Sequence, residues 1–108
     1  MSYNIQVSSQ FKKEAKRLTK KYPSLKKELK EMSLSLSENP FQGVHLGSDV
    51  YKPRISIASK GKGKSGGGRV IHYVQLDDEN VILLTIYNKG EKSSITKEEI
   101  EAILQEFR

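Results

Sequence analysis

The 108-residue sequence contains no cysteine and only two histidines. Without cysteine the chain can form neither disulfides nor thiolate metal sites. Neither His45 nor His72 has a carboxylate at metal-ligand spacing, so we expect no metal and no other cofactor. The chain also lacks a signal pattern and any apolar run near the ~20 residues that span a bilayer. We therefore expect a single cytoplasmic domain over residues 1–108 with no membrane partner.

Proline is scarce, and two of the three prolines mark helix boundaries. Apolar residues three and four apart predict one amphipathic helix that ends before Pro23 and a second that runs from there to Asn39-Pro40. The apolar stripes are Phe11, Ala15, Leu18 and Tyr22, then Leu25, Leu29, Met32 and Leu36. Their short link predicts an antiparallel hairpin that packs on a sheet. We interpret the lysines of these helices as a solvated surface.

Four segments have the alternation or the β-branched and aromatic content of strands. They are Tyr3–Val7, Tyr51–Ala58, Arg69–Leu76 and Val81–Tyr87. Pro53 cannot donate a ladder hydrogen bond, so we expect the second strand to be irregular there or to lie at an edge. We interpret Phe41–Asp49 as a loop. A last helix begins at Thr96, where Glu99 completes a capping box. The order β-α-α-β-β-β-α predicts an α+β fold with an antiparallel sheet covered on one face.

Acidic residues are missing between positions 52 and 69, where six basic residues occur. These are Lys52, Arg54, Lys60, Lys62, Lys64 and Arg69. Lys52 and Arg54 point the same way from one strand, ~7 Å apart, and pairing with the next strand would bring Arg69 close to them, along with Lys89 and Lys92. Such a block predicts attraction to a polyanion or an acidic protein. Converging cations also suit phosphoryl chemistry.

The glycine-rich stretch from Lys60 to Gly68 is a basic loop in which Gly63-Lys64-Ser65 matches the end of a P-loop. Ala58 stands where that motif needs its first glycine, and a strand follows instead of a helix, which excludes nucleotide binding. Tyr73 and Tyr87 either stack on RNA bases or pack within the sheet. His72 either transfers protons or is a satisfied inner histidine.

The segment from Tyr51 to Lys92 resembles the central segment of RelE/HigB-type toxins of the RelE/ParE toxin–antitoxin superfamily. It reads YKPRISIASKGKGKSGGGRVIHYVQLDDENVILLTIYNKGEK, and its most specific part is KGKSGGxRVI followed by an apolar strand ending IYxK. The resemblance implies a curved antiparallel sheet on which a helical hairpin and a C-terminal helix pack. It also implies a toxin that enters the ribosomal A site and cuts mRNA without a metal, by attack of a ribose 2′-hydroxyl on the adjacent phosphate, and that is silenced by a cognate antitoxin protein.

The resemblance also assigns roles to single residues. The second catalytic arginine of the RelE branch falls at Gly90, with Lys89 and Lys92 as neighbours, and its C-terminal tyrosine falls near Thr96. The HigB branch often has a tyrosine at the position of His72. The implied catalytic set is Arg69, Arg54, Lys52, His72 and Lys89, and the implied RNA- and ribosome-binding set is Lys60, Lys62, Lys64, Tyr73, Tyr87 and Lys92.

Two other functions fit the same sequence. The ParE branch shares the fold but poisons DNA gyrase, and a non-catalytic RelE-like domain would bind nucleic acid without cutting it. The departures at Gly90 and Thr96 keep the second alternative open. The basic strand face and the basic glycine-rich loop favour the ribosome-dependent nuclease.

Overall fold

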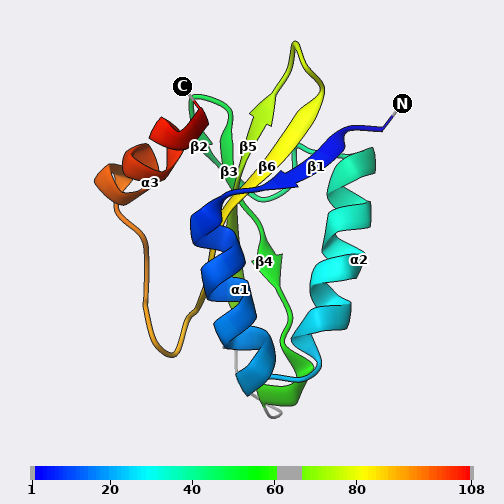
Figure 1. Cartoon of the computed structure of the whole chain (residues 1–108), viewed down its shortest axis with the longest axis vertical. Coiled ribbons are helices and arrows are strands. Elements are labelled where there is room, and N and C mark those ends of the chain that lie inside the picture. Colours follow the sequence, from blue (N-terminus) through cyan, green and yellow to red (C-terminus); the bar gives the residue numbers. More distant parts are fainter. Residues whose placement is uncertain (1, 61–66, 108) are drawn as a thin grey trace.

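The computed structural model describes residues 2–60 and 67–107, and Figure 1 shows how the elements are arranged. In chain order they are β1 (Asn4–Val7), α1 (Ser9–Lys21), α2 (Leu25–Glu38), β2 (Val44–Gly47), β3 (Val50–Lys52), β4 (Arg54–Ile55), the 3₁₀ turn η1 (Ala58–Lys60), β5 (Gly68–Gln75), β6 (Asn80–Asn88), α3 (Lys97–Leu104) and the 3₁₀ turn η2 (Gln105–Phe107). The predicted α+β class and the helical hairpin are confirmed. No helix within these residues has the length and apolar character needed to cross a membrane.

The strands form one sheet in the order β1-β6-β5-β3-β2, and β4 also pairs with β5. Every pairing is antiparallel except that of β1 with β6, which is parallel. The sheet is therefore mixed, whereas we predicted a wholly antiparallel one. Alternating apolar residues specify which face of a strand is buried but carry no information on its direction, so the sequence could not reveal this pairing.

The segment interpreted as a loop contains the edge strand β2, whose residues are all exposed. Exposure removes the alternation by which strands are recognised. The neighbouring strand is interrupted at Pro53 as predicted and gives β3 and β4. Gly43, with φ of +92°, lies against this break, because a Cβ there would come within 2.4 Å of the Pro53 nitrogen. Only glycine fits this close approach.

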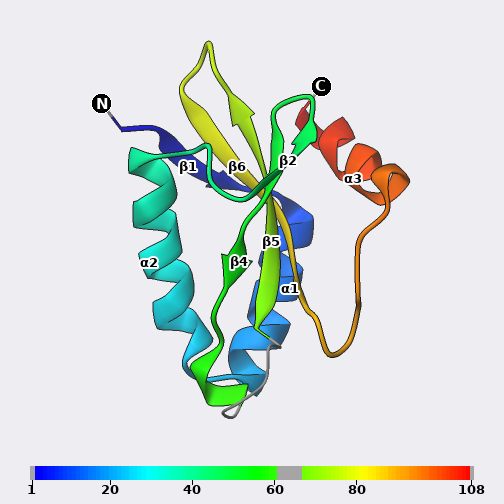
Figure 2. The ribbon, with the colours of Figure 1, turned by 180° about the vertical axis from the view of Figure 1, so that it is seen from behind.

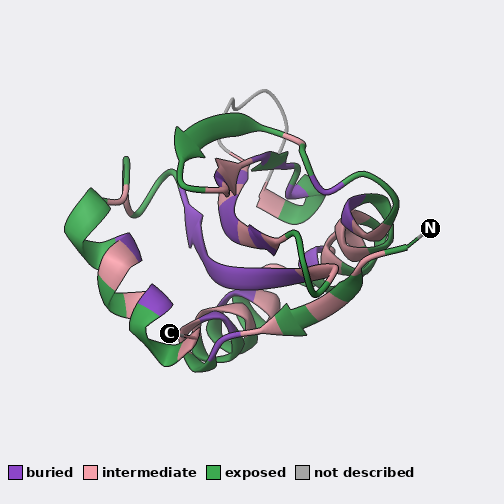
Figure 3. Cartoon of the chain, turned by 90° about the horizontal axis from the view of Figure 1, so that it is seen from above, coloured by how far each residue is buried: buried purple, intermediate pink, exposed green. Residues whose placement is uncertain are grey.

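Both faces of the sheet carry a core, which corrects the prediction of one covered face. On one face α1 and α2 pack through Phe11, Leu18, Leu25 and Leu36 against strand residues that include Val70. On the other face Ile100 and Leu104 of α3 pack against Val50, Ile71 and Leu84. Figure 3 shows the buried residues concentrated in the central strands between these helices. The strands β5 and β6 were long and apolar enough to be predicted because they are buried on both sides.

Two helix starts are fixed by side-chain caps. The Ser8 hydroxyl accepts a hydrogen bond from the Phe11 N–H at 2.9 Å and donates one to the Leu84 carbonyl at 2.6 Å. At α3 the Thr96 hydroxyl accepts from the Glu99 N–H at 3.1 Å, while the Glu99 carboxylate accepts from the Thr96 N–H at 2.9 Å. The predicted capping box is confirmed.

Candidate nucleic-acid interface

Three of the predicted site residues lie on one face of the sheet. Arg54 on β4 is the direct partner of Arg69 on β5, and Arg69 is in turn opposite Tyr87 on β6. Directly opposed residues project from the same face, and Tyr87 belongs to the core on the α3 side. Lys52 follows Val50 of that core by two positions, and strand alternation places it on the same side. Lys52, Arg54 and Arg69 therefore share one face of the sheet.

This row has no acidic partner within residues 2–60 and 67–107. Among the residues that the structure describes, no ion pair involves Lys52, Arg54 or Arg69. The only hydrogen bond found for these side chains there joins Arg69 Nη1 to the neighbouring Gly68 carbonyl at 3.1 Å. Like charges directly opposite on paired strands destabilise a sheet, so the Arg54–Arg69 pair is a local conflict of the kind that marks functional sites.

The face around this row is open. Seen from behind in Figure 2, β4 and the beginning of β5 lie in front of α1, and α3 stands beside the opposite half of the sheet. Arg54 is exposed, and Lys52 and Arg69 are half-buried. A polyanion can therefore reach all three side chains without displacing a helix.

Tyr87 lies next to the cations but is only 6% exposed. Burial raises the pKa of its hydroxyl, and the positive charges of Arg69 and Lys92 oppose that rise. The tyrosine thus stays neutral, and its burial favours the packing role over stacking on a base. Tyr73 is half-buried on the same face, beside Val50.

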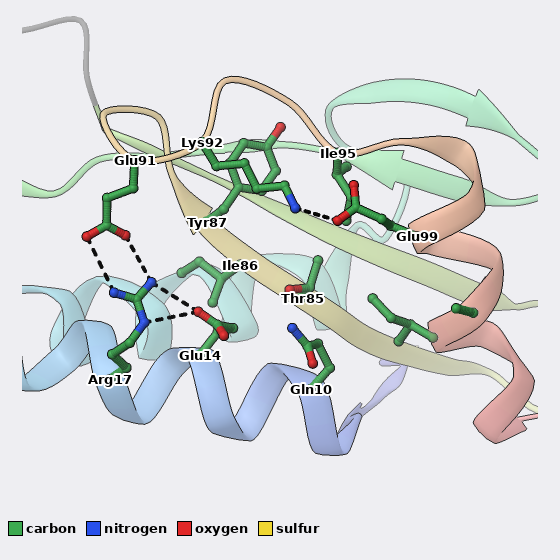
Figure 4. Close-up of a pocket in the computed structure, with 12 residues that line it drawn as sticks. Gln10, Glu14, Arg17, Thr85, Ile86, Tyr87, Glu91, Lys92, Ile95 and Glu99 are labelled. Carbon is green, nitrogen blue, oxygen red and sulfur yellow. Dashed lines mark hydrogen bonds and ion pairs between the residues drawn. The ribbon is translucent and has the colours of Figure 1, made fainter.

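Lys92 borders a groove of about 470 Å³ between α1, β6 and α3. Its ammonium group donates to the Glu99 carboxylate at 2.6 Å, and this hydrogen bond lowers the pKa of Glu99 to about 2. Figure 4 shows the pair on one side of the groove and Arg17 on the other, bonded to Glu14 and Glu91. Each carboxylate here already has a cation, so the groove presents no unpaired charge of its own. Lys89 is exposed in the turn that precedes Lys92.

His72 does not belong to this face. It is 0% exposed and lies opposite Tyr51, with the two rings stacked at a centroid distance of 5.5 Å. Its Nε2 is 2.6 Å from the Pro40 carbonyl, which can only accept, so Nε2 carries the proton. Burial lowers the pKa of the imidazole, and Nδ1 has no partner among the described residues. The structure thus places His72 in the core as an inner histidine, with only one of its two ring nitrogens hydrogen-bonded within the described residues.

The predicted RNA-binding lysines are not all on the sheet face. The Lys60 ammonium contacts the Asn88 side chain, whose amide nitrogen donates to the Tyr22 hydroxyl at 2.8 Å. Lys62 and Lys64 lie outside the described residues. Asn88 and the ion pairs of Glu91 with Arg17 and Lys21 are features that the sequence pattern does not predict. A polar Asn at the end of the apolar run VILLTIY was the one signal for the first of these.

The fold and the open basic face define a small α+β protein with a cationic sheet surface. The family model described as "RelE toxin of RelE / RelB toxin-antitoxin system" matches residues 4–106. Among solved structures, the chain is similar to free E. coli toxin RelE, an arginine-to-alanine double mutant, with a TM-score of 0.64 and 15% identity over 99% of this chain and 98% of that one. The chain belongs to the RelE toxin family. It is a toxin of a toxin–antitoxin system, and an antitoxin is its implied partner.

Proposed function

We propose that the protein is an endoribonuclease that cuts mRNA on the ribosome, with the open face of Lys52, Arg54 and Arg69 as its site. The observation that carries the proposal is the Arg54–Arg69 pair, two arginines directly opposite each other in the register of β4 and β5, neither with an acidic partner in the described part of the chain. A phosphate between them would remove their repulsion. Arginine forks suit phosphate oxygens better than any other side chain.

The reaction proposed here is the one that the resemblance to RelE-type toxins implies, and the cations of this face suit it. The 2′-hydroxyl oxygen of a ribose attacks the adjacent phosphorus and releases its proton. The bond between phosphorus and the 5′ oxygen breaks, and the 5′ oxygen takes up a proton as it leaves. The products are a 2′,3′-cyclic phosphate and a 5′-hydroxyl end. Negative charge grows on the phosphoryl oxygens during the attack, and fixed cations there stabilise the transition state. Because His72 is buried and lies opposite Leu83 of the core on the α1 and α2 side, the proposal gives this work to Lys52, Arg54 and Arg69, with exposed Lys89 as a further candidate.

Substitution of Arg69 tests the proposal. We expect Arg69→Ala to abolish toxicity, because loss of one charge-assisted phosphate contact costs ~1.5–3 kcal/mol in binding and more in the transition state. The toxicity of Arg69→Lys, which keeps the charge but loses the forked guanidinium group, should lie between that of the wild type and that of Arg69→Ala. The measurement is growth arrest on induction, together with mapping of mRNA ends by primer extension.

Codon-linked mRNA ends that are absent from Arg69→Ala cells would support the nuclease. Breaks in DNA with intact mRNA would instead support a gyrase poison. To control for folding, antitoxin binding and the midpoint of thermal unfolding are measured for the variant and for the wild type. Full toxicity of a soluble Arg69→Ala protein would contradict the assignment of this residue.

The same face suits the antitoxin. We propose that an acidic segment of that partner covers Lys52 to Arg69, because it would neutralise a self-repelling surface and exclude RNA at once.

A further inference from the structure

The open sheet face has a further row of residues beyond Arg54. Ile55 and Ile57 belong to the core on the α1 and α2 side, so the exposed Ser56 between them faces the same side of the sheet as Arg54. Although β4 ends at Ile55, Ser56 still runs beside Gly67, because a Cβ on Gly67 would lie 3.5 Å from the Ser56 Cα. Ser56 therefore lies about 7 Å further along the strand than Arg54.

Lys89 continues the path of β6 in the same way. Its backbone N–H donates to the Gly67 carbonyl at 3.4 Å, which extends the pairing of β5 with β6 by one residue beyond Asn88. The Asn88 side chain points to α1, where its amide nitrogen donates to a tyrosine hydroxyl, so alternation directs Lys89 to the opposite side of the sheet. Ser56, Gly67 and Lys89 thus form a row across three neighbouring strand ends, on the side of the cations.

The middle of this row is bare backbone because Gly67 has no side chain. A Cβ there would lie 2.4 Å from the Ile55 carbonyl oxygen, so no other residue fits without a shift of the backbone. The Arg69 guanidinium lies towards this stretch, since its Nη1 donates to the Gly68 carbonyl at 3.1 Å. A hydroxyl, an ammonium group and a guanidinium group therefore border a stretch of backbone that a ligand can approach closely.

Lys89 has no carboxylate partner, because the nearest one along the chain is bound elsewhere. Glu91 pairs with Arg17 and Lys21 of α1, both at 2.9 Å, and its hydrogen bonds to these two side chains lower its pKa to about 2. Near neutral pH the Glu91 carboxylate is therefore charged and held against α1. Among the residues that the structure describes, no ion pair involves Lys89, so its ammonium group is available to an anion.

We propose that Ser56, Gly67 and Lys89 form a subsite for the phosphate that neighbours the cleaved phosphate in the RNA. Their row and the row of Arg54 are ~7 Å apart along the strands, close to one phosphate-to-phosphate step, and Lys52 lies at a similar distance on the other side of Arg54. The RNA backbone then runs along β4 and β5 and places successive phosphates on successive rows. This inference rests on the proposed function and goes beyond it, because it adds Ser56 and gives Lys89 a binding role in place of a catalytic one.

A length series of RNA analogues tests the subsite. The probes are 2′-O-methyl oligonucleotides with one to four phosphates, which have no free 2′-hydroxyl to attack a phosphate, and their binding is measured by fluorescence anisotropy. The affinity of the wild type should rise with each phosphate up to three, and that of Lys89→Gln only up to two. For the three-phosphate probe, Lys89→Gln should bind about tenfold more weakly, and its slope of log affinity against log salt should be smaller by about 0.7.

Ser56→Ala removes a hydrogen-bond donor without removing a charge. It should weaken binding of the three-phosphate probe about tenfold as well, because the hydroxyl donates to a charged oxygen, but it should leave the salt slope unchanged. Lys97→Gln removes one charge from an exposed lysine of α3; as the matched control, it should give the length series of the wild type. In cleavage of mRNA on ribosomes, the loss in Lys89→Gln should appear in KM, whereas Arg69→Ala should lower kcat.

The outcomes separate the subsite from the proposed nuclease function. A length series that rises equally in the wild type, Lys89→Gln and Ser56→Ala would overturn the subsite. A loss of kcat in Lys89→Gln with the length series of the wild type would also overturn it and would make Lys89 a catalytic residue. A length series that depends on Lys89 and Ser56, in a wild-type protein that cuts no mRNA, would support the subsite and contradict the nuclease.

Discussion

At the end of β6 a single amide side chain joins three parts of the chain. Asn88 is 2% exposed, and its Nδ2 donates to the Tyr22 hydroxyl at 2.8 Å. Its Oδ1 accepts from the Lys60 ammonium and from the Gly90 N–H at 3.0 Å. One residue thus fixes the end of α1, the turn before the glycine-rich loop and the turn that carries Lys89. Buried polar groups that are fully satisfied in this way specify one arrangement of their surroundings.

We expect Asn88→Ala to reduce the free energy of unfolding by about 2–4 kcal/mol, because it removes three hydrogen bonds of a buried side chain, one of them to an ammonium group. Urea denaturation with an unchanged m-value would measure it. Asn80→Ala at the other end of β6 is the matched control, since Asn80 is half-buried and donates one side-chain hydrogen bond, to Gln75. If Asn88→Ala and Asn80→Ala lowered the free energy of unfolding equally, the Asn88 hydrogen bonds would stabilise the fold no more than the single Asn80 hydrogen bond does.

The site could be predicted only where single residues follow strand alternation. Alternation predicts Lys52, Arg54 and Arg69 on one face, and the structure has them there although Pro53 divides the first strand into β3 and β4. Lys60 was predicted to contact RNA, yet its ammonium group turns inward to Asn88. That contact joins residues 28 positions apart, and no local pattern encodes such a distance.

Among the elements, α3 depends most on its first turn. It has eight residues, too few for a helix to be stable alone in water, and it is held by the capping box and by Ile100 and Leu104 on the sheet. The cap could be predicted because its two residues are three positions apart. The face of the sheet on which α3 packs could not be predicted, because an apolar stripe does not indicate which surface it packs against.

We expect Thr96→Ala to destabilise the protein by about 1 kcal/mol, the usual loss for an N-cap hydroxyl. Thr96→Ser keeps the oxygen that accepts from the Glu99 N–H and should remain within a few tenths of a kcal/mol of the wild type. The two variants are compared by urea unfolding and by hydrogen exchange of the α3 amides. If alanine and serine behaved alike at this position, the cap would not be what holds the helix.

For the whole molecule, the net charge can be counted from the sequence, but its distribution over the surface depends on the fold. The basic block from Lys52 to Arg69 predicts an anion-binding surface because no acidic residue interrupts it. The larger excess in residues 12–30 was interpreted as ordinary solvated lysine, since a helix pattern alone does not show that the acidic residues are occupied. In the fold, Glu14 and Glu91 pair with Arg17 and Lys21, and the seven other basic residues of this stretch, all lysines, form no ion pair among the described residues.

An uncompensated surface should make the free protein sensitive to salt, because net charge repels itself in the compact state. We expect the free energy of urea unfolding to rise with added sodium chloride, and the triple Lys12, Lys16, Lys20 to Gln variant to be more stable than the wild type at low salt. The gain should be about 0.4–1 kcal/mol, from two like-charge pairs at four-residue spacing, and should shrink as salt screens the repulsion. Lys97→Gln serves as the single-charge control. A triple variant no more stable than the wild type at low salt would show that these lysines do not strain the free fold.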